Sequence, residues 1–432
     1  MNITITPGRL RGTVTPPPSK SQAHRALIAA ALAAGESRIS HVSHSQDMKA
    51  TLGCMTALGA SAEWTDSTEI RLAGIGERTM DRRPVLDCGE SGSTLRFLIP
   101  IALAVAGGGV FRGHGRLMRR PQDPYFEIFR EKGIAFSQRD DTLVVEGVLT
   151  PGQYRLRGDV SSQFITGLLY ALPLLDGDSE ICLTTVLESA GYIDMTLETL
   201  AQFGVAVQQT EGGWHVPGGQ RYLPCSVTVE PDWSQAGFWY AAQGIGNEIA
   251  VAGMNLNSPQ GDKIILDWGR RIRREAVHPG AADLMWEEQM PGAIERWEED
   301  EGVVSIDVSH SPDLVPPVAA WGALMNGTLH IRNAARLRIK ESDRLASVAA
   351  VLGALGADIQ EEPEGLIIRG KAALDGGVTV DSWNDHRIAM MAAVAATRCR
   401  APVTITGAES VNKSYPEFWQ DYRALGGIAE ES

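Results

Sequence analysis

The chain has 432 residues, of which 44% are hydrophobic and 21% charged, and its formal net charge is −14. This length exceeds one comfortable hydrophobic core, so two large domains are expected, and the apolar content excludes a disordered chain. The acidic balance argues against nucleic acid or an anionic membrane as a partner. Any site for anionic ligands must therefore gather its lysines and arginines locally.

Six copies of one pattern follow one another along the chain. Each copy has a short strand, a loop with Ser, Asp or Gly, a helix rich in Ala and Leu, and then a β-branched strand. The loop positions 20, 91, 161, 233, 311 and 384 lie 71, 70, 72, 78 and 73 residues apart. The predicted helices are, in chain order, 26–33, 95–106, 164–175, 236–243, 315–324 and 388–396.

A second motif, a glycine turn followed by an alternating stretch such as 364–368, indicates a hairpin after most helices. The unit is therefore roughly βαβαββ, and three copies per lobe predict two lobes. If the N-terminal strand belongs with the last copies, the chain crosses between lobes near Pro16 and again near Glu230-Pro231. The expected lobes are 1–17 plus 231–432, and 18–230. The charge-rich segment 270–301 fits no part of the repeat.

The repeated loops open helices, and a helix N-terminus attracts phosphates and carboxylates. Some loop residues, such as Asp232, are typical N-caps and need no other role. The loop around Lys20 differs, because it puts a lysine where a helix start favours an acidic residue, with Arg25 close behind. Residues 161–163 are three consecutive hydrogen-bonding side chains, whereas capping the N-terminus of one helix needs only one. These loops are predicted to bind anions.

Further cations crowd the segments 116–121, 384–387 and 412–416. Lys340 and Arg344 are predicted to lie on one helix face at positions i and i+4, where their repulsion indicates an anion between them. No resident metal or cofactor is expected, since the nine histidines lack ligand spacing. The match of 365–371 to a nucleotide-binding loop fails, because Ala372 replaces the required Ser or Thr and the run lies in a strand.

The N-terminal residues, the longest apolar run and the cysteines indicate where the protein resides. The first twelve residues lack the apolar core of a secretory signal, and the apolar run 97–111 contains Pro100 and is too short to span a bilayer. The five cysteines show no paired spacing, which fits a reducing compartment. A cytoplasmic protein is expected, and nothing in the sequence demands an oligomer, so a monomer is expected.

At these motifs the sequence resembles the 5-enolpyruvylshikimate-3-phosphate synthase (3-phosphoshikimate 1-carboxyvinyltransferase) family over essentially its whole length. The motifs that carry the resemblance are Pro18 to Ser21 with Arg25, Gly89 to Arg96, Arg116 to Pro121, Ser161 to Gln163, Ser189 with Tyr192 to Asp194, Pro312-Asp313, Lys340 to Arg344, Asn384 to Arg387 and Lys413. The resemblance implies an α/β (α+β) fold of two closing lobes, each of three βαβαββ units, an inside-out α/β barrel.

The resemblance also implies a reaction that moves the enolpyruvyl group of phosphoenolpyruvate to the 5-hydroxyl of shikimate 3-phosphate, without a metal. The implied catalytic residues are Asp313 as base, Glu341 as proton donor, and Lys20. Those implied to bind shikimate 3-phosphate are Lys20, Ser21, Arg25, Ser161, Ser162, Gln163, Ser189, Tyr192, Asp313 and Lys340. Those implied to bind phosphoenolpyruvate are Lys20, Gly92, Arg120, Gln163, Arg344, Arg387 and Lys413.

Three positions depart from the family pattern: Glu90 stands where Asn is usual, Phe97 where Pro is usual, and Arg336 where Asn is usual. Two alternative functions remain open from the sequence. One is the related transferase that acts on UDP-N-acetylglucosamine, although its loop cysteine is missing from 116–121. The other is a non-catalytic protein that binds phosphorylated metabolites, which would not require both Asp313 and Glu341.

Overall fold

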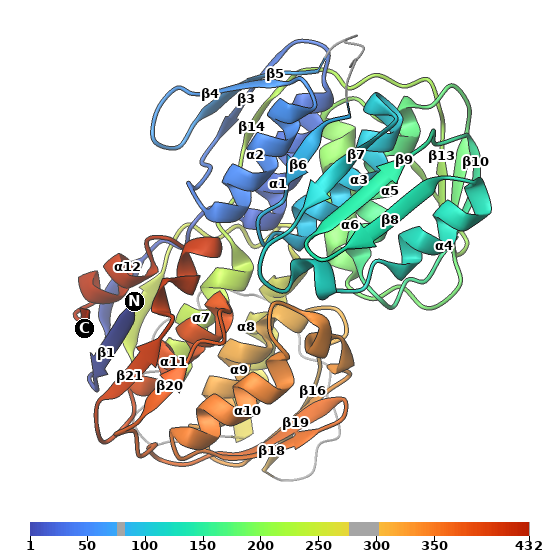
Figure 1. Ribbon diagram of the computed structural model, residues 1–432. Coiled ribbons are helices and arrows are strands. Elements are labelled where there is room, and N and C mark those ends of the chain that lie inside the picture. The colour runs from blue at the N-terminus through green and yellow to red at the C-terminus, as the bar shows by residue number, and fades with distance from the viewer. Residues whose placement is uncertain (76–82, 276–301, 432) are drawn as a thin grey trace. The chain divides into compact units, whose positions relative to one another are not determined.

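The computed structural model describes residues 1–75, 83–275 and 302–431 of the chain. Its residues form two compact units (Figure 1). Unit 1 comprises 1–17, 231–256 and 262–432, and unit 2 comprises 18–230 and 257–261. The unassigned segment 270–301 lies largely outside the described residues, which end here with helix α8 (Ile265–Glu275) and resume at 302.

Unit 2 holds three of the repeats, and each contributes one four-stranded sheet. Its elements are α1 (Lys20–Leu32), β3 (Glu36–Ser40), α2 (Gln46–Ala57), β4 (Ser61–Trp64), β5 (Ile70–Ala73), β6 (Val85–Asp87), α3 (Gly92–Ala106), β7 (Gly108–Arg112), η1 (Leu117–Arg119), α4 (Asp123–Lys132), β8 (Ala135–Arg139), β9 (Thr142–Glu146), β10 (Gly152–Leu156), α5 (Ser162–Ala171), η2 (Leu172–Leu174), β11 (Ser179–Leu183), α6 (Ala190–Gln202), β12 (Gln208–Thr210), β13 (Gly213–Val216) and β14 (Ser226–Thr228).

Unit 1 holds the other repeats in two four-stranded sheets and one two-stranded sheet. Its elements are β1 (Asn2–Thr6), β2 (Arg11–Val14), α7 (Trp233–Gly244), β15 (Glu248–Val251), η3 (Gly261–Ile264), α8, β16 (Val303–Asp307), η4 (Pro312–Leu314), α9 (Val315–Gly322), β17 (Thr328–Arg332), η5 (Ala335–Ile339), α10 (Arg344–Ala354), β18 (Asp358–Glu362), β19 (Gly365–Arg369), β20 (Thr379–Asp381), α11 (His386–Ala396), β21 (Val403–Thr406), η6 (Ala408–Lys413), α12 (Phe418–Ala424) and β22 (Ile428–Glu431).

In the second, third and fifth copies the predicted repeat has one and the same strand order. The strand before the helix pairs in parallel with the strand after it, and a hairpin completes the sheet, as in β16-β17-β19-β18. Figure 1 shows the sheets of each unit on the outside of a central group of helices. This arrangement explains why α11 is buried along its whole length, since a helix that is apolar all round needs neighbours on every side. The described strands form separate sheets, none of them closed into a barrel.

The first and fourth copies of the repeat exchange their first strands, as the expected crossings near Pro16 and Glu230-Pro231 imply, although the strand pairing itself was not predicted. β2 leads into α1 but pairs in parallel with β15, whereas β14 leads into α7 but pairs in parallel with β3. Each exchanged strand therefore lies in the unit opposite to that of the helix that follows it in the chain. Residues 257–261 also group with unit 2, although the sequence-based boundaries placed them in the other lobe.

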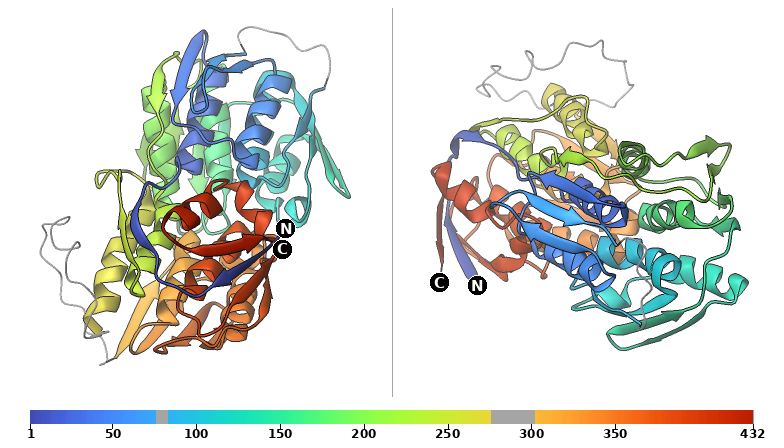
Figure 2. Two further views of the ribbon diagram at one scale, coloured as in Figure 1. Left: turned by 90° about the vertical axis from the view of Figure 1, so that its left-hand side faces the viewer. Right: turned by 90° about the horizontal axis from the view of Figure 1, so that it is seen from above.

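The N-terminal strand completes the last repeat. β1 lies between β21 and β22, antiparallel to both, with Ile3 opposite Ile405 and Glu431. It occupies the place that the fourth strand of the repeat takes in the other four-stranded sheets. Both termini consequently lie side by side at the edge of unit 1 (Figure 2).

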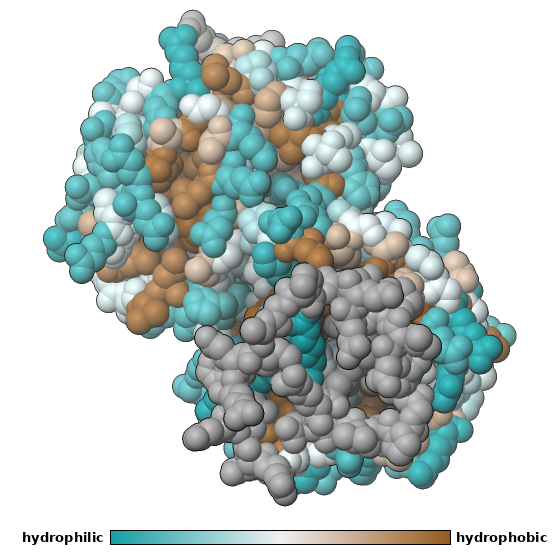
Figure 3. All heavy atoms as spheres, turned by 180° about the vertical axis from the view of Figure 1, so that it is seen from behind, coloured by the Kyte–Doolittle hydropathy of each residue, from teal (hydrophilic) through white to brown (hydrophobic). Residues whose placement is uncertain are grey.

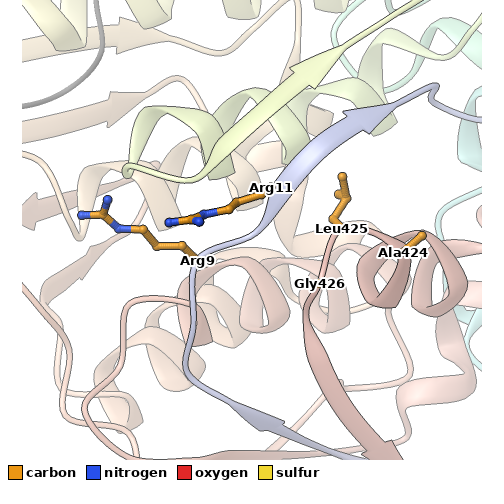
Figure 4. Close-up of a pocket in the computed structure, with 5 residues that line it drawn as sticks. All are labelled: Arg9, Arg11, Ala424, Leu425 and Gly426. Carbon is orange, nitrogen blue, oxygen red and sulfur yellow. The ribbon is translucent and has the colours of Figure 1, made fainter.

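Figure 3 shows hydrophilic residues interspersed with apolar patches over one face of unit 2. Val148 and Val186 are among the exposed large hydrophobic residues of this unit. No described helix is long and apolar enough to cross a membrane. A cavity of about 600 Å³ in unit 1 is lined by Arg9, Arg11, Ala424, Leu425 and Gly426 (Figure 4). None of the residues predicted to bind substrate lines it.

Candidate functional site

In unit 2 the loop before α1 presents Lys20 at the first position of the helix. Ser19 caps the helix by accepting a hydrogen bond from the backbone N–H of Gln22 at 3.4 Å. The Lys20 ammonium lies 3.0 Å from Asp47 Oδ2, and 16% of the lysine side chain is exposed. Asp47, in the first turn of α2, was not predicted, because its partner comes from another element. It holds the lysine in place and balances its charge.

Arg25 lies one turn further along α1 and is buried. Its guanidinium donates to Thr196 Oγ1 at 2.9 Å and to the carbonyls of Ser21 and Tyr192 at 2.7 and 2.8 Å. Burial lowers the pKa of Arg25 to about 10, although the nearby tyrosines oppose this shift. The side chain therefore stays charged at neutral pH. Three of its five N–H groups donate to other groups within the described part of the chain.

The loop before α3 is shaped around Arg120. A Cβ at Gly92 would lie only 2.6 Å from Arg120 Nη1, so glycine is required for the guanidinium to lie against this helix N-terminus. Glu90, the departure from the family pattern, has its carboxylate beside Gly115, where an added Cβ would come within 2.6 Å of Oε2. Its carboxylate thus packs against the loop at Gly115, which has a left-handed backbone (φ 56°).

The third loop of unit 2 precedes α5. Ser161 accepts from the backbone N–H of Gln163 at 3.3 Å and acts as the N-cap, which leaves Ser162 and Gln163 for other contacts, as expected. Gln163 accepts from Arg96 Nη1 at 2.8 Å and donates to Ser93 Oγ at 2.9 Å. Arg96, which lies over the ring of Phe164, was not predicted as a site residue. It links α3 to α5 and fixes the orientation of the Gln163 amide.

Ser189 and Tyr192 lie at the start of α6. Ser189 precedes the helix in a left-handed backbone conformation (φ 57°), which is uncommon for serine, and its side chain is buried without capping the helix. The Tyr192 ring lies 5.9 Å from the Arg25 guanidinium, and its carbonyl accepts from the same group. The structure therefore brings Tyr192 to Arg25, as the sequence prediction requires.

In unit 1 the predicted residues meet at Asp313, which lies in η4 just before α9. Its Oδ1 accepts from Arg344 Nη1 at 2.8 Å and lies 3.5 Å from Lys340 Nζ, while Oδ2 accepts from Arg387 Nη2 at 3.1 Å. Burial alone would raise the pKa of Asp313, but Arg387, Lys340 and Arg344 outweigh it and hold the pKa well below its usual range. Asp313 is ionised at neutral pH.

Arg344 connects three carboxylates and is 1% exposed. Besides Asp313, its Nη2 donates to Glu341 Oε2 at 2.7 Å and its Nε to Asp385 Oδ2 at 2.8 Å. Burial alone would lower the pKa of Arg344, but the three carboxylates outweigh it and raise that pKa above its ordinary value. Bidentate and forked contacts of this kind need a guanidinium, which a lysine cannot replace.

The expectation that Lys340 and Arg344 share a helix face is wrong. Lys340 follows η5 in an extended conformation, and Arg344 begins α10 after Asp343 as N-cap. Both cations instead contact Oδ1 of Asp313, a carboxylate of the protein itself. Burial lowers the pKa of Lys340 to about 8, against the opposing charge of Asp313.

Two further cations of the prediction lie near the start of α11. Arg387 donates to the backbone carbonyl of Asp313 at 3.0 Å, in addition to its carboxylate. The Lys413 ammonium donates to the carbonyl of Asn384 at 2.6 Å. Asp385, the N-cap of α11, is 0% exposed and accepts from Arg344 and from Ser342 Oγ at 3.0 Å. It was not predicted as a site residue, although it orders both α11 and Arg344.

Comparison with known proteins shows which family the chain belongs to. Residues 5–422 match the family model of EPSP synthase (3-phosphoshikimate 1-carboxyvinyltransferase). The chain belongs to the EPSP synthase family. Relatives named 3-phosphoshikimate 1-carboxyvinyltransferase are 43% identical in Clostridium novyi (strain NT), over 100% of this chain and 98% of that protein, and 44% identical in Clostridium acetobutylicum, over 99% and 98%.

Solved structures show the same fold. An EPSP synthase from Acinetobacter baumannii matches with a TM-score of 0.77 at 24% identity, covering 99% of each chain. The enolpyruvyl transferase NikO from Streptomyces tendae matches with a TM-score of 0.76 at 17% identity, covering 100% of this chain and 98% of that one. The family and the fold predicted from the sequence are confirmed, and the EPSP synthase assignment does not favour either alternative function.

The remaining departures from the EPSP synthase pattern have structural partners. Phe97 is buried in α3, with its ring 5.3 Å from the Arg25 guanidinium, so a cation–π contact stands where proline is usual. Arg336 donates to the backbone carbonyl of Ser309 and lies in η5, the turn that leads to Lys340. Phe97 thus contacts a residue of the predicted site, whereas the printed partner of Arg336 is a backbone carbonyl.

Proposed function

We propose that this EPSP synthase family member transfers the enolpyruvyl group of phosphoenolpyruvate to the 5-hydroxyl of shikimate 3-phosphate and releases phosphate. The observation that carries the proposal is the Arg344 guanidinium, which holds both carboxylates that the reaction needs, Asp313 and Glu341, at 2.8 and 2.7 Å. A protein that only binds phosphorylated metabolites has no use for two carboxylates among its cations. A monomeric, cytoplasmic enzyme is part of this proposal.

The substrates are assigned by their charges. Hydroxyls and cations suit the phosphate and ring of shikimate 3-phosphate, whose proposed residues are Lys20, Ser21, Arg25, Ser161, Ser162, Gln163, Ser189, Tyr192, Asp313 and Lys340. Phosphoenolpyruvate carries a phosphate and a carboxylate, which arginine forks bind well, and its proposed residues are Lys20, Gly92, Arg120, Gln163, Arg344, Arg387 and Lys413.

The reaction proceeds by addition and elimination. Asp313 accepts the proton of the 5-hydroxyl as its oxygen attacks C2 of phosphoenolpyruvate, and Glu341 gives a proton to the methylene carbon. The resulting tetrahedral intermediate loses phosphate when Glu341 removes a proton from the new methyl group. The low pKa of Asp313 makes it a weak base in the free protein. Bound phosphate and carboxylate groups would neutralise the same cations and raise its basicity.

The direct test mixes the purified full chain with phosphoenolpyruvate and shikimate 3-phosphate and measures phosphate release. Release with both substrates, and with neither alone, supports the proposal. Release only when UDP-N-acetylglucosamine replaces shikimate 3-phosphate would reassign the acceptor. Tight binding of both substrates without release would make the chain a binding protein.

Replacing Gly92 by alanine should weaken phosphoenolpyruvate binding. The new methyl group would meet Arg120 Nη1 at 2.6 Å and displace the guanidinium from the helix N-terminus. We expect KM for phosphoenolpyruvate to rise about tenfold or more, and KM for shikimate 3-phosphate to change little. Gly53→Ala is the matched control, since nothing lies within 4 Å of a Cβ there. Equal KM values in the two variants would contradict the assigned role of Arg120.

Shikimate 3-phosphate should bind less tightly above pH 8. Lys340, with a pKa of about 8, is a cation below that pH and loses its charge as the pH rises through it. If the bound phosphate keeps Lys340 protonated, Kd rises by about tenfold per pH unit above pH 8. Calorimetric titrations between pH 7 and 9.5 measure this. Lys340→Arg, which stays charged, should bind independently of pH over that range.

Deprotonation of Lys340 has the opposite effect on the stability of the folded protein. Its pKa is about 8 in the folded protein and near 10.5 when unfolded, so the unfolded chain binds more protons between these values. The contribution of Lys340 to the free energy of unfolding therefore rises with pH across this window, while ligand affinity falls. A Kd that stays flat up to pH 9.5 in the native protein would remove Lys340 from the phosphate site.

A further inference from the structure

A buried chain of polar side chains in unit 2 runs from α1 to the loop before α3. His24 Nδ1 lies 2.8 Å from Thr51 Oγ1, which lies 2.7 Å from Thr94 Oγ1, which in turn lies 2.8 Å from Ser91 Oγ. None of the four residues is more than 1% exposed. Each proton in this chain must therefore be shared within it or given to a bound molecule.

The number of protons available fixes the direction in which these side chains donate hydrogen bonds to one another. Ser91 Oγ accepts from both the backbone N–H and the hydroxyl of Thr94, at 3.2 and 2.8 Å. A hydroxyl has one proton, so Thr94, which donates to Ser91, must accept from Thr51. Thr51 has then used its own proton and must accept from His24. The Nδ1 atom of His24 therefore carries the ring proton.

The charge state of His24 agrees with this direction. Burial, together with the charges of Lys20 and Arg25, holds the pKa of His24 well below its usual range, so the ring is neutral. Its Nε2 atom is then an acceptor, and it has no hydrogen-bond partner among the described residues. The tautomer with the proton on Nδ1 is the one that free histidine disfavours in water. Only the hydroxyl of Thr51 favours it here.

At the end of this hydrogen-bonded series, the Ser91 hydroxyl still has a proton to donate. Ser91 accepts two hydrogen bonds, and no described residue accepts its hydroxyl proton. It directly precedes Gly92, against which Arg120 packs. We infer that the Ser91 hydroxyl is a further hydrogen-bond donor to phosphoenolpyruvate, and that His24 is a positioning residue that sets the direction of this donor through Thr51 and Thr94. The inference deepens the proposed function and rests on it.

The first test needs no enzyme activity. Two-bond ¹H–¹⁵N spectra of the histidine-labelled full chain report which ring nitrogen of His24 carries the proton. We expect the Nδ1–H tautomer in the native protein and a shift toward Nε2–H in Thr51→Val, where the acceptor is gone. An Nε2–H tautomer in the native protein would refute the directed chain, whatever the reaction catalysed.

The second test compares two helix caps. Ser91→Ala and Ser45→Ala each remove a buried serine that accepts from the helix, at 3.2 Å from Thr94 N and 3.4 Å from Met48 N. Both should lose similar stability. Only Ser91→Ala should raise KM for phosphoenolpyruvate, by about tenfold, with KM for shikimate 3-phosphate unchanged.

The His24 variants complete the test. His24→Asn keeps an N–H donor near the position of Nδ1 and should retain a KM for phosphoenolpyruvate close to native. Thr51→Val and His24→Leu break the chain and should raise it. Equal KM values in Ser91→Ala and Ser45→Ala would overturn the role of Ser91 in an active enzyme. Absence of turnover in the native chain would instead overturn the proposed function.

Discussion

Glu341→Gln should lower kcat by about 10³-fold or more while leaving shikimate 3-phosphate bound with nearly native affinity. A glutamine amide has the shape of the carboxylate, and its oxygen can still accept from Arg344 Nη2, which lies 2.7 Å from Oε2. It cannot, however, give a proton to the methylene carbon and take one back. General acid and base groups typically contribute about 10²- to 10⁴-fold, and here one residue serves two steps. Steady-state kinetics and calorimetric titration with shikimate 3-phosphate measure the two effects separately.

Glu361→Gln is the matched control for this variant. Glu361 also accepts from an arginine, with 2.7 Å between its Oε1 and Arg338 Nη1, but it lies in β18 outside the proposed site. The Glu361→Gln variant should have the native kcat. If Glu341→Gln retained more than about a tenth of native kcat, Glu341 would not be the proton donor.

Arg344→Met should be the most destabilising of the proposed substitutions. Methionine fills much of the space but leaves Asp385, which is 0% exposed, without its cation. It also removes the guanidinium that separates three neighbouring carboxylates. Removing one partner of a buried ion pair typically costs about 3 to 5 kcal/mol. Urea unfolding followed by tryptophan fluorescence reports mainly on the affected unit, since eight of the ten tryptophans belong to unit 1.

Arg338→Met provides the comparison for Arg344. Arg338 also contacts two carboxylates, Asp343 and Glu361, but 31% of its side chain is exposed, so its loss should cost about 1 kcal/mol or less. Arg344→Lys should separate charge from geometry, because an ammonium cannot contact three carboxylates in a fork. We expect it to fold better than Arg344→Met yet to lack activity. A loss in Arg344→Met no larger than that in Arg338→Met would show that the buried network is not required for stability.

Much of this fold could be predicted from the sequence because its signals are local. Apolar helices, capping residues and glycine turns recur at a nearly constant interval, and each signal depends on neighbours in the chain. Candidate site residues could also be proposed from the sequence, because phosphate and carboxylate ligands require cations and hydroxyls at helix starts. Lys20, Arg120 and Gln163 are buried or partly buried beside such starts, as expected.

The errors concern relations between distant elements. The sequence places β2 before α1, but the hydrogen-bonding partner of β2 is β15, which only the folded chain reveals. Asp47 and Asp385 carry no local sign of their function, because Lys20 and Arg344 reach them from other elements. The spacing of Lys340 and Arg344 suggested a helix, yet the chain breaks between them so that both reach Asp313.

The position of β1 between β21 and β22 has a consequence for how the protein is made. The chain of unit 2 is nearly continuous, and its last strand ends at Thr228, so this unit can fold while synthesis continues. β1 is synthesised about 400 residues before its partners, which begin at Val403 and Ile428. At about 5 to 20 residues per second, synthesis of those 400 residues takes roughly 20 to 80 s. During that time β1, which carries Ile3 and Ile5, has two unpaired edges, and unpaired strand edges promote aggregation.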